Sequence, residues 1–143
     1  MSTIVVGVDG SECAKKALRF AAEEAELRHA ALRVVCAWGL PSSAEYAGGF
    51  GPIDQSVFTA FHEQARKTVD DALAEVRWAH PTEKVEVRVV RDQPAKAILD
   101  QSHDASLVVV GNRGRGGFAS LLLGSVSEET VHHAHCPVVV IHG

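Results

Sequence analysis

Short apolar runs alternate with longer segments of helical period along the whole chain. Four of the runs contain few polar residues, as expected of strands buried on both faces of a parallel sheet, and they cover residues 4–8, 32–37, 107–110 and 137–141. A fifth segment, residues 85–90, begins by alternating valine with charged residues. This alternation predicts a strand near the edge of the sheet, with one wetter face.

Four segments between these strands carry apolar residues at the spacing of a helix face. The first two cover residues 11–28 and 55–79, and the third begins at Pro94, a residue favoured at the first helical position. Ser125 with Glu128 fits a capping box that opens the last helix.

Five strands alternating with four helices predict an α/β fold, in which an open parallel sheet is covered by helices on both faces. A length of 143 residues suits one domain spanning residues 1–143. The stretch 39–52 is rich in glycine and proline and predicts a long loop rather than a domain linker. In such sheets, ligands bind at the carboxyl ends of the strands, where the strand order reverses.

The most informative segment runs from Gly111 to Ser125, because it follows a buried strand and leads into the last predicted helix. Backbone without Cβ atoms that ends at a helix N-terminus can wrap an anion closely. Gly114 and the pair Gly116–Gly117 allow positive φ angles, so that backbone N–H groups can point into one concavity. Residues 7–9 end the first strand and converge on the same sheet edge. We therefore predict a loop that holds nucleotide phosphates, with a ligand-free glycine loop as the alternative.

This pattern resembles the universal stress protein family, in the branch that binds ATP. The family's glycine motif, G-x2-G-x9-G-S/T, is matched without a gap by Gly111, Gly114, Gly124 and Ser125. The family's first strand, which ends in aspartate, and its closing run are similar to residues 4–9 and 135–141. The likeness covers essentially the whole chain.

The resemblance implies a Rossmann-like sheet of order 3-2-1-4-5 and a homodimer built around the last strand. It implies a stress-response protein that binds an adenine nucleotide, ATP with Mg2+. Asp9 would meet the ribose above a floor of Gly7 and Val8, while Ala37 would border the adenine. Ser125 and Val126 would hold the terminal phosphates. The loop around ribose and phosphates would comprise Gly111, Asn112, Arg113, Gly114, Arg115, Gly116 and Gly117.

The sequence offers no clear catalytic apparatus. Asp9 is the only acidic candidate near the predicted site, and the G-x-x-x-x-G-K-[ST] loop of fast nucleotide hydrolases is missing. We therefore expect a regulatory or structural nucleotide with at most slow hydrolysis. The alternatives are an ATP-cleaving hydrolase or nucleotidyl transferase, with a second pocket from residues 39–52, and an interaction module with a vestigial site. The intact glycine pattern counts against the last.

Other local patterns have plainer explanations. His132, His135 and Cys136 have the spacing of one helix face, but no second ligand group lies at structural-zinc spacing, so we predict no metal site there. Asp9 could instead cap the first helix. Residues 121–123 would either pack the loop onto the domain or contribute to a partner interface.

Composition and charge limit the kinds of partner and the cellular compartment that we expect for this protein. A formal net charge of -4 argues against a general nucleic-acid binder, and no apolar run approaches the roughly 18 residues of a membrane helix. Three cysteines without paired spacing do not suggest a disulfide framework, and the N-terminus lacks an export signal. We therefore expect a cytoplasmic protein without nucleic-acid or membrane partners.

Overall fold

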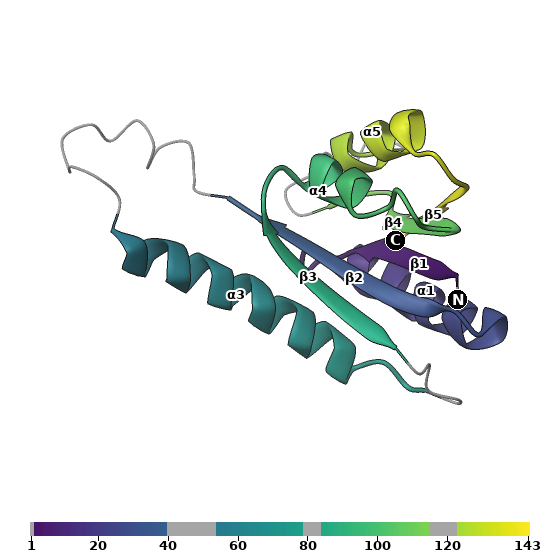
Figure 1. The fold of residues 1–143 in the computed structure, drawn as a ribbon, viewed down its shortest axis with the longest axis horizontal. Coiled ribbons are helices and arrows are strands. Elements are labelled where there is room, and N and C mark those ends of the chain that lie inside the picture. Colours follow the sequence, from purple (N-terminus) through teal and green to yellow (C-terminus); the bar gives the residue numbers. More distant parts are fainter. Residues whose placement is uncertain (1, 40–53, 79–83, 115–122) are drawn as a thin grey trace.

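Five parallel strands form one sheet in the order β3-β2-β1-β4-β5 in the computed structural model (Figure 1). Every neighbouring pair is parallel, so the strand order implied by the family resemblance is confirmed. The strands are β1 (Thr3–Gly7), β2 (Ala31–Trp38), β3 (Val85–Arg91), β4 (Leu107–Gly111) and β5 (Val138–Ile141).

The structure describes residues 2–39, 54–78, 84–114 and 123–143. Most of the predicted long loop and part of the glycine loop, including Arg115, Gly116, Gly117 and residues 121–122, lie outside the described residues.

Helices cover both faces of the sheet, as predicted (Figure 1). They are α1 (Glu12–Arg28), α3 (Gln55–Ala74), α4 (Pro94–Asp100) and α5 (Ser125–His133). Two apolar clusters lie against the sheet. One joins α1 and α3 to Ile4, Val6 and Val34, while the other joins α4 and the start of α5 to residues that point the opposite way, such as Val5 and Val35. This division follows from the two-residue period of a strand.

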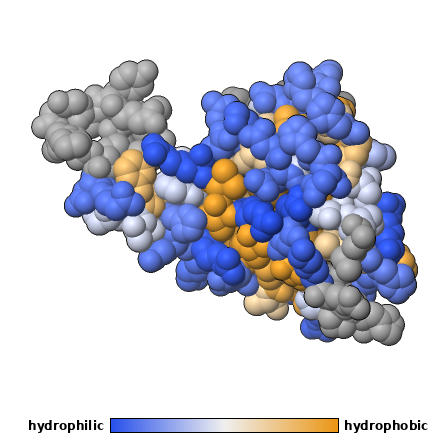
Figure 2. All heavy atoms as spheres, viewed as in Figure 1, coloured by the Kyte–Doolittle hydropathy of each residue, from blue (hydrophilic) through white to orange (hydrophobic). Residues whose placement is uncertain are grey.

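The burial of the strands agrees with their sequence patterns. Residues 4–6 of β1 and 107–110 of β4 are buried, whereas β3 lies at the edge and exposes Arg88 and Arg91. Figure 2 shows hydrophobic residues gathered along the line that β2 and β3 follow in Figure 1, with hydrophilic residues on both sides. In the described residues, no helix is both long and apolar enough to cross a membrane.

Local sequence signals predicted the starts of α1 and α4 but not the end of α3. Ser11, the first residue of the predicted segment, caps α1, since its hydroxyl accepts a hydrogen bond from the Ala14 amide at 3.1 Å, and the helix begins at Glu12, close to the predicted start. Pro94 is the first residue of α4, also as predicted. By contrast, α3 ends at Ala74 rather than near residue 79. Val76 and Trp78 keep the apolar character of the helix because they still pack on the core after the helix has ended.

Candidate functional site

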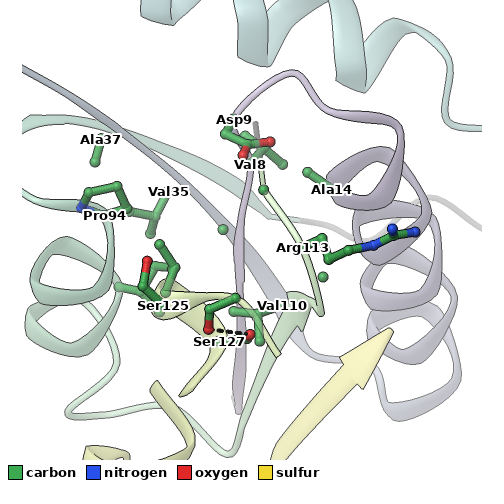
Figure 3. Close-up of a pocket in the computed structure, with 16 residues that line it drawn as sticks. Val8, Asp9, Ala14, Val35, Ala37, Pro94, Val110, Arg113, Ser125 and Ser127 are labelled. Carbon is green, nitrogen blue, oxygen red and sulfur yellow. Dashed lines mark hydrogen bonds between the residues drawn. The ribbon is translucent and has the colours of Figure 1, made fainter. Parts of the chain in front are cut away.

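A cavity of about 510 Å³ opens at the carboxyl ends of the central strands (Figure 3). It lies where the chain leaves β1 for one side of the sheet and β4 for the other, which is where open α/β sheets bind ligands. Its volume falls within the range of small-molecule and cofactor sites, roughly 300–1,000 Å³. The lining residues are Gly7, Val8, Asp9, Ala14, Val35, Ala37, Pro94, Ile98, Val110, Gly111, Arg113, Gly114, Gly124, Ser125, Val126 and Ser127.

All of the predicted site residues that the structure describes line this cavity, except Asn112. The structure thus brings the end of β1, the end of β2 and both ends of the glycine loop together around one space. Contact of these residues with a nucleotide stays a prediction.

Asp9 is held by the turn that begins α1. Its Oδ1 accepts a hydrogen bond from the Ser11 amide at 2.9 Å, which fixes the carboxylate at the rim of the cavity. Asp9 therefore supports the start of α1, but the helix cap itself is Ser11. Gly114 lies directly beside this carboxylate, because an added Cβ on Gly114 would lie 2.8 Å from Asp9 Oδ2.

Close approach, rather than positive φ, explains the described glycines of the loop. Among the described glycines only Gly10 has a positive φ, of 86°. The expected positive φ at Gly114 was wrong, and Gly116–Gly117 lie outside the described residues. A Cβ on Gly111 would lie 2.7 Å from Cys13 Sγ, closer than real contacts allow.

The two ends of the glycine loop meet at a short backbone hydrogen bond. The Gly124 amide donates to the Asn112 carbonyl at 2.6 Å, and a Cβ on Gly124 would lie 3.3 Å from that same oxygen. Gly124 is therefore the N-cap of α5, and the predicted capping box of Ser125 with Glu128 was wrong. Ser125 is instead the first helical residue, and the glycine before it packs closely against the Asn112 carbonyl.

The N-terminus of α5 consequently faces the cavity. Ser125, Val126 and Ser127 all line it, and the first amides of a helix have no partners within the helix. These donors and the helix dipole make this wall suited to an anion. Figure 3 shows Ser125 and Ser127 in one part of the cavity wall and Asp9 and Val8 in another.

The charges around the cavity are few. Asp9 is the one carboxylate in the described lining, and that lining contains no lysine, histidine or glutamate. Arg113 lines the cavity, but its guanidinium donates to the Gly143 carbonyl at 3.2 Å, and Figure 3 shows its side chain extending away from Ser125. Backbone donors and one carboxylate can bind a polar ligand, and Asp9 is the single candidate general base in this described lining.

Asn112 is the predicted site residue that lies behind the cavity. Its side chain is buried and faces Cys13 of α1 and the residues that follow β5. Six further lining residues were not predicted from the sequence: Ala14, Val35, Pro94, Ile98, Val110 and Ser127. Pro94 carried a usable signal, since a helix that starts directly after a parallel strand begins at the same sheet edge as the other strand ends.

Trp38 and His135 do not line the cavity. Trp38 is half-buried at the end of β2 and packs against α3, with its ring nearly parallel to that of Phe61 at 6.4 Å. His135 stacks on His103 at 5.6 Å. Within the described part of the chain, no group of three or more potential ligand side chains is arranged to hold a metal ion.

Comparison with known proteins gives the wider context. The chain matches the model of the universal stress protein family over residues 1–142. It is 38% identical over 137 residues to universal stress protein Rv2623 of Mycobacterium tuberculosis, covering 96% of this chain and 44% of that protein. The chain therefore spans about half the length of the curated relatives that it matches.

Two solved structures share the fold and carry nucleotides. A universal stress protein in complex with cAMP is 26% identical, with a TM-score of 0.62 and coverage of 99% of this chain and 96% of that chain. A universal stress protein of Archaeoglobus fulgidus in complex with dAMP is 27% identical, with a TM-score of 0.58 and coverage of 99% and 98%. The matching family model, the identity to Rv2623 and the shared fold lead to one conclusion: the chain belongs to the universal stress protein family.

Proposed function

We propose that this chain binds an adenine nucleotide, ATP with Mg2+, as a regulatory or structural ligand in the cavity. The observation that carries the proposal is the closed glycine loop, in which Gly124 is hydrogen-bonded to Asn112 and the N-terminus of α5 opens on the cavity opposite Asp9. The two related complexes support the ligand class, because cAMP and dAMP are both adenine nucleotides.

The lining fits the parts of such a ligand. Val8, Val35 and Ala37 offer an apolar surface for a flat base, and Asp9 can accept hydrogen bonds from ribose hydroxyls. The amides that start α5 and the Ser125 hydroxyl can donate to phosphates. Mg2+ is held by oxygen ligands, commonly one or two carboxylates together with substrate phosphates, and Asp9 is the carboxylate at hand.

Slow turnover belongs to the same proposal. Phosphoryl transfer needs a positioned nucleophile and charge stabilisation around the terminal phosphate. The described lining supplies donors but no lysine, and Arg113 is directed to the carbonyl of Gly143. The ligand would thus persist on the protein rather than be consumed quickly.

We further propose a cytoplasmic homodimer. The three cysteines are free thiols, which suits a reducing compartment. β5 is the outer strand on its side of the sheet and carries no charged residue, so pairing with β5 of a second copy would cover an edge that otherwise invites aggregation.

Mass spectrometry of nucleotide released from purified, denatured protein tests the ligand directly. We expect an adenine nucleotide, and calorimetric titration should show ATP binding with a preference over GTP. Asp9→Asn should weaken ATP binding by about tenfold, because a charged acceptor becomes a neutral one. Asp100→Asn, an isosteric change in an exposed ion pair of α4, is the matched control and should have no effect. Absence of both copurified nucleotide and ATP binding at millimolar concentration would refute the proposal.

A further inference from the structure

Asn112 is the predicted site residue that the cavity does not use, and it joins three separate segments. Only 7% of its surface is exposed. Its Oδ1 accepts a hydrogen bond from the Gly143 amide at 3.2 Å. The Cys13 thiol of α1 lies 3.2 Å from the same Oδ1 and 3.2 Å from the Ile141 carbonyl, so these two acceptors share its one proton. The side-chain nitrogen of Asn112 lies 3.2 Å from His142 Nδ1. The side chain therefore ties the end of β4 to α1 and to the residues after β5.

The backbone of the same residue holds the start of α5. The Asn112 amide donates to the Ile141 carbonyl at 2.8 Å, which continues the β4–β5 ladder by one residue. The Asn112 carbonyl accepts from the Gly124 amide at 2.6 Å, and it also lies 3.2 Å from the hydroxyl of Ser127. The two peptide groups on either side of Asn112 thus link the sheet edge to the N-cap and the first turn of α5.

We infer that Asn112 is a positioning residue for the phosphate side of the nucleotide site. Its side chain fixes the orientation of the peptide whose carbonyl accepts the hydrogen bond of the Gly124 amide and shares the Ser127 hydroxyl with the Gly124 carbonyl. That carbonyl in turn fixes the N-terminal amides of α5 beside the cavity. The inference rests on the proposed nucleotide function, since it assigns a role within that same site.

The base side of the cavity is held by other contacts. Val8 and Val35 are joined by a backbone hydrogen bond of 2.9 Å that continues the β1–β2 ladder. Ala37 belongs to β2, which is in register with β3 from Leu32 to Trp38. None of these contacts passes through Asn112. Loss of the Asn112 side chain should therefore weaken phosphate binding selectively, and a ligand without phosphates should be affected little.

Calorimetric titration with adenosine, AMP, ADP and ATP distinguishes an effect of Asn112 on phosphate binding from an effect on the stability of the fold. Wild-type protein is measured first, because failure to bind ATP would remove the proposed function itself. In Asn112→Ala, we expect ATP affinity to fall by about tenfold or more and adenosine affinity to stay within about twofold. Val69→Ala, a core substitution in α3 away from the cavity, is the control for lost stability and should leave both affinities unchanged.

A matched pair at Cys13 tests the same link without altering Asn112. Cys13→Ala removes the thiol that Asn112 Oδ1 shares with the Ile141 carbonyl and should weaken ATP binding by about threefold, whereas Cys13→Ser keeps a donor and should bind like wild type. If Asn112→Ala does not fold, the two Cys13 variants test the positioning role of Asn112 in its place. Equal losses for ATP and adenosine in Asn112→Ala would overturn the inference, as would unchanged ATP affinity in Asn112→Ala or in Cys13→Ala.

Discussion

Single residues of the site are constrained by neighbours that are remote in sequence. Gly114 faces the Asp9 carboxylate so closely that a Cβ would lie 2.8 Å from Oδ2. Gly39 offers a contrast, because a Cβ there would meet nothing within 4 Å. The two glycines therefore allow the same substitution to be made with and without steric conflict.

Gly114→Ala should weaken ATP binding by at least about tenfold, because the added methyl group must displace Asp9 or the loop from the cavity. Its stability should change by less than about 1 kcal/mol, since Gly114 is exposed. Gly39→Ala should leave affinity unchanged. Titration calorimetry and thermal unfolding of both variants provide the check. Wild-type affinity in Gly114→Ala would contradict the assignment of the loop to the phosphates.

The glycine pattern predicted the place of the site but not the reason for each glycine. The sequence favoured positive φ at Gly114, a local property, whereas the structure requires a close approach to Asp9, which depends on the packing of β1 against β4. The same holds for Asn112, whose partners Cys13 and Gly143 come from opposite ends of the chain. Tertiary contacts of this kind leave no periodic signal in one sequence.

At the scale of elements, an ion-pair network fastens the β3 edge to the rest of the sheet. Arg33 of β2 donates to its register neighbour Glu86 of β3 at 2.7 Å and to Asp104, after α4, at 2.8 Å. The side chains of Arg33 and Glu86 are 11% and 10% exposed. The hydrogen bond from Arg33, together with that from Lys84, lowers the pKa of Glu86 below its ordinary value.

Glu86→Gln should therefore reduce stability in a pH-dependent way. A carboxylate with a lowered folded-state pKa stabilises the fold above its unfolded pKa, and this contribution is lost as the pH falls through the folded value. We expect the variant to be about 1–2 kcal/mol less stable than wild type at pH 7, with the difference shrinking below about pH 4. Asp70→Asn, in an exposed pair on α3, should cost about 0.5 kcal/mol or less. Urea unfolding across pH would show a constant difference if the ion pair were irrelevant.

Element order was predictable, but of the two α4 residues at the cavity only Pro94 carried a signal in the sequence. Apolar runs and capping signals located the strands and most helix starts, because these signals are local. Pro94 and Ile98 line the cavity because α4 packs against the end of β1, where an added Cβ on Gly7 would meet Ile98 Cδ1 at 2.5 Å. That packing depends on strand order, which came from the family resemblance and not from the pattern of residues.

For the molecule as a whole, the residues that line the cavity predict a slow turnover of ATP. Its described lining combines helix amides, one carboxylate and apolar side chains, which favours retention of a ligand. We expect ATP turnover well below the typical enzyme value of roughly 10 per second. A phosphate-release assay on purified protein measures it, and Asp9→Asn identifies any contaminating hydrolase, whose rate would not change. Turnover at ordinary enzyme rates that this substitution abolishes would favour a hydrolase instead.

The proposed homodimer is argued from β5, an outer strand of the sheet. β5 pairs with β4 along one side only, and the carbonyls of Pro137 and Ile141 accept hydrogen bonds from the β4 side. Because backbone groups alternate along a parallel strand, Val138 and Val140 turn their N–H and C=O groups to the open edge. An antiparallel β5 from a second copy, related by a two-fold axis, would satisfy both edges at once.

Val140→Pro should therefore produce a folded monomer, because it removes an outward N–H and leaves the bonds to β4 in place. Val140→Ala is the matched control: it also loses packing on the α4 side of the sheet, but it keeps the amide and should remain dimeric. Light scattering over a range of micromolar concentrations distinguishes the two states, and circular dichroism confirms that both variants fold. A wild-type protein that stays monomeric at these concentrations would exclude the β5 dimer. A dimeric Val140→Pro variant would place the interface elsewhere.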